Sequence, residues 1–467
     1  MKNRYLYAVR VTAFCIGLSL NRYNTSLMKK NVLYLSLFLG GTLALLANCG
    51  DGESSTTEVT PSETGTVAPD THCVTAPASW FSGSSTPAPN DYGPFSDTAT
   101  TTDCDFHLWS WQKFLSLTRS ANGRAPFEDL VQVDNDLNKL GKELTLIDSS
   151  QAGSAGTLYD KNGRAVHYSI YLNPEMYAFQ KKMLPIFKKN LDSLQAKGLD
   201  TMNYPVGCIE IKAAWVFTSA LSKAERKNYY ISKANLYGST VEVALIGMHI
   251  VGRVDKHPEL IWATFEHDGL APDYDWKNKD TNQVLSKKSS LFYKANTTAN
   301  NCPMNNGKTS PAGFTNIFNF YKLGMPESYN NSAVPSSRDL TNNANIEALN
   351  KSVISQLGKI KSVWAHYFYK GSVWLNDPDD SNFQPGDGNI GSLTNTSLRG
   401  SRAIGNITME TFVQNQSSTS INSGSMNCFD CHGTSDFKNN VGYNLALSHL
   451  FMNALFNYGL KTPIKSE

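Results

Sequence analysis

Apolar and polar residues alternate through the middle of the chain. From about residue 165, five segments are rich in β-branched and aromatic residues, and several alternate with period two: AVHYSIYLN, GCIEIKAAWVFTS, KNYYISKANLYG, TVEVALIGMHIVGR and PELIWATFEHDG. The separations between them are short, which favours antiparallel pairing over units with crossover helices. One helical pattern, residues 176–198, interrupts the series. This region therefore predicts a mainly antiparallel sheet.

Helical patterns flank this region. Residues 105–118 place Trp109, Trp111 and Phe114 along a helical pattern, and Asp105 is positioned to cap its start. Further helical patterns cover 342–370 and 443–460, whereas 270–345 has few apolar runs and predicts irregular structure. We expect an α+β fold. A large body at residues 105–395, with flanking helices, would be followed by a small, mostly helical C-terminal module at 396–467.

The first 49 residues have the pattern of a secretion signal. From Met28, two lysines precede an apolar run, Val32 to Leu46, and small and polar residues then lead to Cys49. The run is too short for a permanent membrane span. The stretch LANC resembles a bacterial lipobox, in which the cysteine is acylated, although Asn48 departs from the usual small residue. Residues 1–49 are expected to be a signal region with Cys49 as the lipid site; an ordinary secretory signal is the alternative.

A polar tract rich in Ser, Thr and Pro follows Cys49. Because such a tract cannot bury apolar surface, residues 50–104 are expected to form a flexible tether. Gly50 follows the cysteine, where an aspartate would favour retention in the inner membrane. The expected location is therefore the outer membrane, with the protein held by its lipid anchor and facing the periplasm or the cell surface.

Charge and cysteine content narrow the possibilities further. Net charge is +2 over 467 residues and the chain has no basic run, so no nucleic-acid partner is expected. An exported chain enters an oxidising compartment, where paired cysteines form disulfides. Apart from Cys15, Cys49 and two cysteines near the C-terminus, four remain, which allow three pairings. The most local pairing joins Cys73 to Cys104 and Cys208 to Cys302.

The stretch SMNCFDCHG, residues 425–433, carries the most specific chemistry in the sequence. In a CxxCH motif, two thiols add across the vinyl groups of haem, and the adjacent histidine becomes the proximal iron ligand. A thioredoxin-like CxxC would follow a strand and precede a long helix, whereas these flanks are rich in Ser and Gly. A zinc site would need two further ligands, and no second CxxC or HxxxH is present. A disulfide within so short a loop would be strained.

The segment CFDCHG resembles the attachment site of c-type cytochromes. The pieces IEIKAAW, IGMHIVGR, IWATFEH and NITMETFVQ are similar to a broader group of exported bacterial proteins with one C-terminal CxxCH and no established activity. The resemblance implies one covalent haem c and electron transfer, with Cys428 and Cys431 as thioether sites and His432 as axial iron ligand. Small soluble cytochromes place this motif early and a distal methionine much later; here only 35 residues follow His432.

The sixth iron position has three candidates, His449, Met452 and Met409. His449 and Met452 share one face of the expected closing helix, although a core methionine and a half-buried histidine are the alternative interpretation. Met248 and His249 are neighbours in an expected strand, so they point to opposite faces and cannot both serve. A methionine ligand would raise the reduction potential relative to histidine, and a vacant position would open the iron to small molecules.

Two other groups of polar residues are weaker. Glu266, His267 and Asp268 end an expected strand, which suggests either acid–base chemistry or a solvated turn. The acidic stretch 374–389 offers oxygen ligands for calcium, but it lacks EF-hand spacing and is more typical of a surface loop. The sequence thus predicts a single-electron carrier that meets a redox partner protein or a small-molecule donor or acceptor. The alternatives are a haem-dependent redox enzyme of oxidase or peroxidase type, with its substrate pocket in the body, and a surface binding module with a structural haem.

Overall fold

The computed structural model describes residues 67–81, 101–119, 123–149, 157–189, 204–255, 257–273, 280, 282–298, 322–323, 337–375, 398–401, 404, 406–410 and 448–457. The expected signal region and Cys49 lie outside these residues. The described residues from Val67 onward belong to one compact unit.

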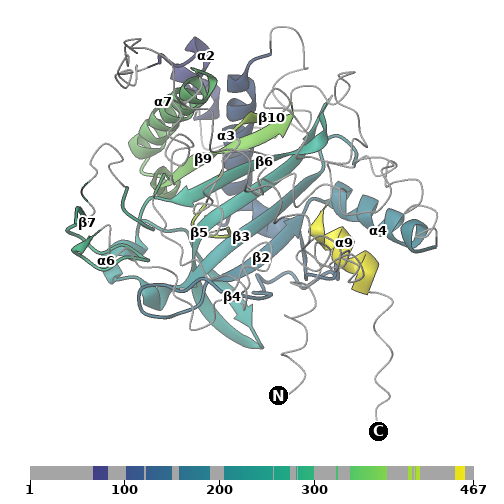
Figure 1. The fold of residues 1–467 in the computed structure, drawn as a ribbon. Coiled ribbons are helices and arrows are strands. Elements are labelled where there is room, and N and C mark those ends of the chain that lie inside the picture. Colours follow the sequence, from purple (N-terminus) through teal and green to yellow (C-terminus); the bar gives the residue numbers. More distant parts are fainter. Residues whose placement is uncertain are drawn as a thin grey trace, which may run out of the picture. The chain divides into compact units, whose positions relative to one another are not determined.

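An eight-stranded antiparallel sheet is the centre of the unit, as the alternation predicts (Figure 1). Every neighbouring pair runs antiparallel, and β4 lies off the main path, where it forms a hairpin with the long strand β5. The order across the sheet is β1 (Val131–Val133), β2 (His167–Leu172), β3 (Ile209–Phe217), β5 (Ser239–Val254), β6 (His257–His267), β9 (Tyr367–Leu375) and β10 (Leu398–Gly400), with β4 at Ile231–Leu236. A separate pair consists of β7 (Val284–Ser286) and β8 (Thr297–Thr298).

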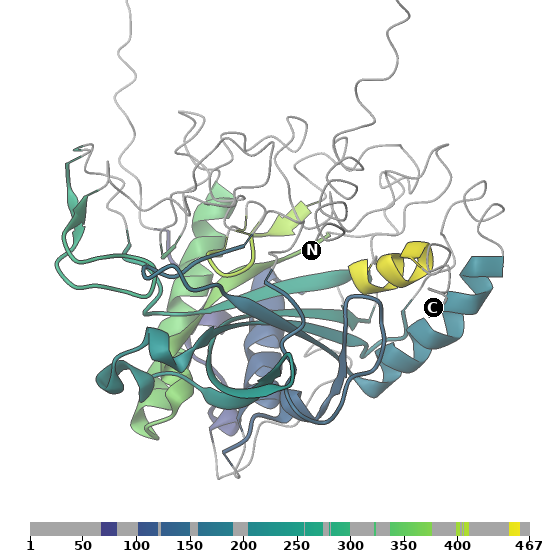
Figure 2. The ribbon, with the colours of Figure 1, turned by 90° about the horizontal axis from the view of Figure 1, so that it is seen from below.

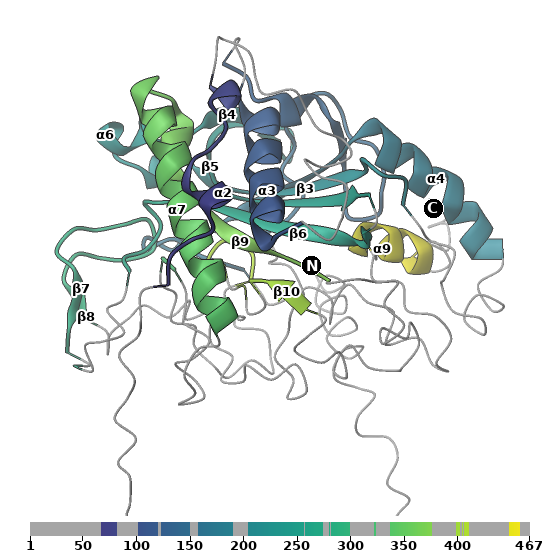
Figure 3. The same cartoon turned by 90° about the horizontal axis from the view of Figure 1, so that it is seen from above.

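Helices α3 (Asp103–Thr118) and α7 (Ser337–Lys359) cover one face of the sheet (Figure 3). Trp109, Trp111 and Phe114 of α3 are buried there against Met248 and Phe265 of the sheet. The first turn of α3 is closed by Asp105, whose Oδ2 accepts a hydrogen bond of 2.8 Å from Thr102 N. The predicted helix is therefore confirmed, with Thr102 rather than Asp105 as the residue that precedes it.

The opposite face carries two apolar clusters. One gathers Tyr168, Ile246 and Met409, and the other joins the sheet to α4 (Pro174–Lys189) and α9 (His449–Asn457). Figure 2 shows α9 beside α4, and the rings of Phe187 and Phe451 meet edge to face at 5.3 Å. The remaining short helical elements are α2 (Thr71–Val74), α6 (Lys223–Arg226), η1 (Ala78–Trp80), η2 (Pro126–Asp129), η4 (Thr218–Ala220) and η7 (Val363–His366).

The helix expected to continue to residue 370 ends at Lys359. Lys361 adopts a positive φ of 53°, the short turn η7 follows, and β9 begins at Tyr367. Alternate residues Tyr367 and Tyr369 are buried under α3 and α7. The aromatic residues after the helix therefore follow the period of a strand, and the prediction was wrong over this stretch.

Residues 67–81 pack against the body, although they were expected in the tether. Asn345 of α7 exchanges two hydrogen bonds with Asp70: its Oδ1 accepts from Asp70 N at 2.7 Å, and its Nδ2 donates to Oδ2 at 2.8 Å. Ser352 Oγ accepts from Ala76 N at 2.9 Å. Cys73 and Cys104 form a disulfide. The folded body thus begins before residue 105, and the boundary between tether and body lies closer to the N-terminus than the sequence predicts.

The described residues after 395 belong to the body instead of forming a separate module. β10 pairs with β9 at the sheet edge, and Ile407 and Met409 are buried in the cluster around Tyr168. Leu450, Phe451 and Leu455 of α9 are buried with sheet residues. The α+β class is confirmed, and the described residues of 396–467 pack on the body; the haem module at 396–467 stays a prediction. No helix among the described residues is at once long and apolar enough to cross a membrane.

Candidate functional site

Five polar residues form a line between the two apolar clusters, on the sheet face away from α3 and α7. They come from four adjacent strands, β3, β5, β6 and β9, and we call them the polar strip: Lys212, His249, Thr264, Glu266 and Lys370. Lys212 pairs with His249, His249 with Thr264, and Gly247 with Glu266. Directly paired residues share a face, as do residues two apart in one strand, so the side chains lie together.

His249 is hydrogen-bonded through both ring nitrogens. Its Nδ1 lies 2.9 Å from Thr264 Oγ1, and its Nε2 lies 3.0 Å from Glu410 Oε2. Asn406 also donates to Glu410 Oε2. Burial alone would raise the pKa of Glu410, but the charge and hydrogen bond of His249 and the hydrogen bond from Asn406 outweigh burial and lower it. Glu410 is therefore held as a carboxylate against the strip.

Glu266 is fully buried and binds the same C-terminal segment. Its Oε1 accepts hydrogen bonds from Ile407 N at 2.6 Å and Thr408 N at 3.0 Å, and its Oε2 lies 3.8 Å from Lys370 Nζ. Burial raises the pKa of Glu266 and lowers that of Lys370, because each charged form loses water. Tyr168 donates to Thr408 O at 2.7 Å. Residues 406–410 are thus fixed to the sheet by backbone and side-chain contacts.

Gly247 permits this close approach. A Cβ at this position would lie 2.4 Å from Thr408 Oγ1. Any side chain would therefore push residues 406–410 away from the strip.

A second contact holds Ser448, the residue directly before α9. The hydroxyl of Ser448 donates to Glu210 Oε2 at 2.7 Å. Glu210 is paired with Val251. Glu210 lies two residues before Lys212 in β3, and Val251 lies two residues after His249 in β5. The side chain of Glu210 is therefore on the same sheet face as the polar strip. Glu410 and Ser448, which bracket residues 411–447, are therefore both bound to one sheet face. Cys428, Cys431 and His432 fall within 411–447 and lie outside the described residues.

The expected distal ligands occupy different surroundings. Met409 is fully buried in the apolar cluster around Tyr168, and its backbone N donates to Asn406 Oδ1 at 2.7 Å. His449 begins α9 and is half-buried. Met452 lies in the same helix, and its side chain is outside the described part of the structure. Met248 and His249 point to opposite faces, as predicted, with Met248 in the core under α3.

The cysteines match the expectation in part. The predicted Cys73–Cys104 disulfide is present, but Cys208 is a free, buried thiol. Burial raises the pKa of Cys208 to about 12. The expected pairing of Cys208 with Cys302 is therefore not formed in this structure; Cys302 itself lies outside the described residues.

His267 and Asp268 are neighbours, with His267 Nδ1 3.4 Å from Asp268 Oδ1, but Glu266 is not part of this group. Glu266 faces the polar strip, whereas His267 stacks on Tyr229 at 3.5 Å between ring centroids and its Nε2 lies 2.9 Å from Asn228 O. Burial lowers the pKa of His267 to about 4. Asp268 is exposed, with Oδ2 3.5 Å from His366 Nδ1. The solvated-turn interpretation suits Asp268, and the acidic stretch 376–389 is outside the described residues.

Sequence reasoning did not single out Lys212, Lys370, Glu210 or Glu410. One signal was available: charged residues replace apolar ones in otherwise apolar strands, as in IEIK and FYKG. Such residues cost free energy unless they are paired, so charges within adjacent strands indicate a shared polar site.

Within the part of the chain that the structure describes, no group of three or more His, Cys, Asp or Glu side chains is arranged to hold a metal ion. Comparison with known proteins gave no match to any family model, curated protein or solved structure.

Proposed function

We propose that the chain is an exported c-type cytochrome that carries one covalent haem and transfers single electrons at the cell envelope. The CxxCH motif at residues 428–432 carries the proposal. Cys428 and Cys431 would hold the haem by thioether bonds, and His432 would be its axial ligand. The haem supplies reversible one-electron iron chemistry when it is bound. Cys49 would anchor the protein by a lipid at the outer membrane.

The cysteine arrangement supports this proposal. Cys73 and Cys104 are bonded to each other, and Cys208 is buried with a raised pKa, so none of these three thiols is available to pair with the motif. A disulfide in the body also agrees with an oxidising compartment, and c-type haem is attached outside the cytoplasm.

Contacts on one sheet face hold both ends of the segment that contains the motif. Glu410 is held by His249, and Ser448 is held by Glu210, so both flanks of residues 411–447 are tied to one face of a rigid sheet. These contacts restrict the ends of the segment and lower the entropy cost of ordering it around a cofactor. His249 itself is occupied by Thr264 and Glu410 and suits a positioning role better than iron ligation.

His449 and Met452 are the proposed alternatives for the sixth position. Met409 fits a packing role, since it is enclosed by apolar residues. Reduced and oxidised absorption spectra of His449→Ala and Met452→Ala would separate the two candidates. Loss of a methionine–iron charge-transfer band only in Met452→Ala would assign Met452; a shift in the spectrum only in His449→Ala would assign His449.

The test of covalent haem is a pyridine haemochrome spectrum of protein made in a host with a cytochrome c maturation system. A c-type spectrum and haem that stays with the protein on a denaturing gel are expected. Both should be lost in Cys428→Ala/Cys431→Ala and kept in the matched variant Cys208→Ala, which removes a buried thiol outside the motif. An intact protein without haem would overturn the proposal, and the two thiols would then be tested for redox or metal chemistry.

A further inference from the structure

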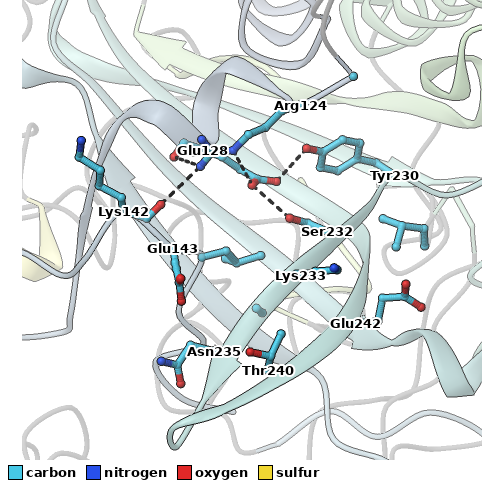
Figure 4. A pocket seen from close by; sticks show the side chains of 14 residues that line it. Arg124, Glu128, Lys142, Glu143, Tyr230, Ser232, Lys233, Asn235, Thr240 and Glu242 are labelled. Atoms are coloured by element: carbon cyan, nitrogen blue, oxygen red, sulfur yellow. Dashed lines mark hydrogen bonds and ion pairs between the residues drawn. The ribbon is translucent and has the colours of Figure 1, made fainter.

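A pocket of about 770 Å³ opens beside the hairpin of β4 and β5, and its lining shares no residue with the polar strip. The hairpin forms one wall, and residues 124–128 and 142–144 form the other (Figure 4). Pockets of this size accept small organic ligands, whose class is set by the polar groups of the lining.

The floor of the pocket is a preorganised carboxylate. Glu128 is buried and accepts hydrogen bonds from Tyr230 Oη at 2.8 Å, Ser232 Oγ at 3.1 Å and Arg124 Nε at 3.3 Å. Arg124 also donates from Nη1 to Asp129 at 2.6 Å and from Nη2 to the carbonyl of Glu128 at 3.1 Å. These groups are already satisfied by one another. They therefore fix the shape of the pocket, and the residues that would recognise a ligand are those of the two walls.

Within the described ranges, the walls of the pocket carry unpaired side chains of positive and of negative charge, together with an unpaired hydroxyl group. Lys142, Glu143, Lys233 and Thr240 are exposed, and their side chains have no hydrogen-bond or ion-pair partner among the described residues. Glu242, the remaining charge in the lining, lies 3.6 Å from Arg226. A strongly anionic ligand would meet Glu143 and Glu242, and a strongly cationic one would meet the two lysines. The lining therefore suits a ligand that both donates and accepts hydrogen bonds without a large net charge.

An exposed aromatic ring sits at the tip of the same hairpin. Tyr237 lies two residues after Asn235 of the lining and is 86% exposed. It adopts a φ of 52° and Gly238 a φ of 85°, between the paired residues Leu236 and Ser239. Such a two-residue turn favours Asn-Gly, and a bulky residue with positive φ is strained. Because the ring of Tyr237 is exposed, no packing offsets this backbone strain. Strain that packing does not offset indicates a binding role.

From these features we infer that the pocket binds a saccharide, with Tyr237 stacking on a sugar ring. A sugar ring has an apolar face that covers an aromatic ring, and its hydroxyl groups both donate and accept hydrogen bonds. Lys142, Glu143, Lys233 and Thr240 supply the complementary groups. For an exported protein, this site would attach the body to glycan. The inference is independent of haem binding.

Calorimetric titration of the full exported protein with three neutral trisaccharides tests the inference. The probes are maltotriose, cellotriose and triacetylchitotriose. At least one should bind with a Kd below about 1 mM, the weak end of specific recognition. Tyr237→Ala and Lys233→Ala should each weaken binding by about tenfold or more, and Tyr237→Phe should keep it because the ring remains. Lys288→Ala, an exposed lysine outside the pocket, is the matched control.

A further variant separates loss of binding from loss of folding. Tyr237→Asn relieves the backbone strain and removes the ring, so the melting temperature should rise while binding is lost. Two results would overturn the inference: no binding of any probe by the native protein at about 10 mM, or binding that Tyr237→Ala and Lys233→Ala leave unchanged. Haem content should be the same in all these variants, so failure here would leave the cytochrome proposal standing.

Discussion

At the scale of single residues, Glu210 is the ionisable group best placed to make stability depend on pH. Burial raises its pKa to about 7, while the hydrogen bond from Ser448 and the charge of Lys212 oppose the rise. Because the pKa is higher in the folded state than in the unfolded chain, the folded protein holds this proton more tightly. The associated stability is fully present below the unfolded pKa of 4.5 and is lost as the pH rises to about 7.

We therefore expect Glu210→Gln to have a higher free energy of unfolding than the native protein at pH 8, by about 3 kcal/mol, because each pKa unit corresponds to about 1.4 kcal/mol. At pH 4 the two should unfold alike, since the native side chain is then neutral in both states. Urea denaturation at several pH values measures the difference. Glu347→Gln, an exposed glutamate on α7, should show no such trend. A constant difference between pH 4 and pH 8 would contradict this account.

The buried pair of Glu266 and Lys370 gives a second prediction at this scale. Glu266→Gln keeps an oxygen for the backbone N–H groups of Ile407 and Thr408 but removes the main counter-charge of Lys370. The expected cost is about 3 kcal/mol, as for other buried pairs broken on one side. Lys370→Met in the same chain should recover part of this cost, because the uncompensated charge is then gone. A double-mutant cycle in urea measures the coupling, and additive effects would show that the pair does not interact.

At the scale of elements, the Cys73–Cys104 disulfide connects residues 67–81 to α3. The two cysteines are 31 positions apart, so the bond closes a loop whose entropy cost in the unfolded chain is about 3–4 kcal/mol. Cys73→Ala/Cys104→Ala should lose roughly that amount of stability and make residues 67–81 more susceptible to proteolysis. Cys208→Ala keeps the disulfide, so reducing agent should still lower its melting temperature. The double alanine variant should be insensitive to reducing agent; a remaining effect would indicate a second disulfide.

The junction of α7 and β9 shows how one element limits the next. The apolar residues of 342–370 suggest one helix, yet Lys361 turns the chain and the aromatic residues from Tyr367 enter the sheet. Tyr367 Oη donates to Leu245 O at 2.8 Å, a contact that only the strand arrangement allows. Tertiary hydrogen bonding and burial thus outweigh the local helical pattern.

At the scale of the whole molecule, the C-terminal residues complete the sheet face. Ile407, Met409, Leu450, Phe451 and Leu455 are all nearly fully buried. Each contributes about 1.5–3 kcal/mol by burial, so together they approach the net stability of an ordinary domain. A chain that ends at residue 395 should therefore aggregate or lose fixed tertiary structure, whereas one that ends at residue 457 should fold. Near-UV circular dichroism and gel filtration distinguish these outcomes; a monomeric, folded chain ending at 395 would instead support a separate module.

The sequence by itself determined the features that depend on nearby residues. Period-two alternation located the sheet strands β2, β3, β4, β5 and β6, because side chains of a strand point to its two faces in turn. The same argument placed Met248 and His249 on opposite faces. The most local cysteine pairing was correct for Cys73 and Cys104. The CxxCH motif is read from adjacent residues alone, and haem attachment there stays a prediction.

The tertiary structure alone decided which distant residues meet. His249 and Glu410 are 161 positions apart, and Glu210 and Ser448 are 238 apart, so no local pattern links them. Their meeting depends on strand register, including the shifts at Ala214/Trp215 and Thr264/Phe265. A shift of one residue would move every side chain of a strand to the other face. For this reason only the packed structure reveals the polar strip, the free thiol of Cys208 and the contacts of the C-terminal residues with the sheet.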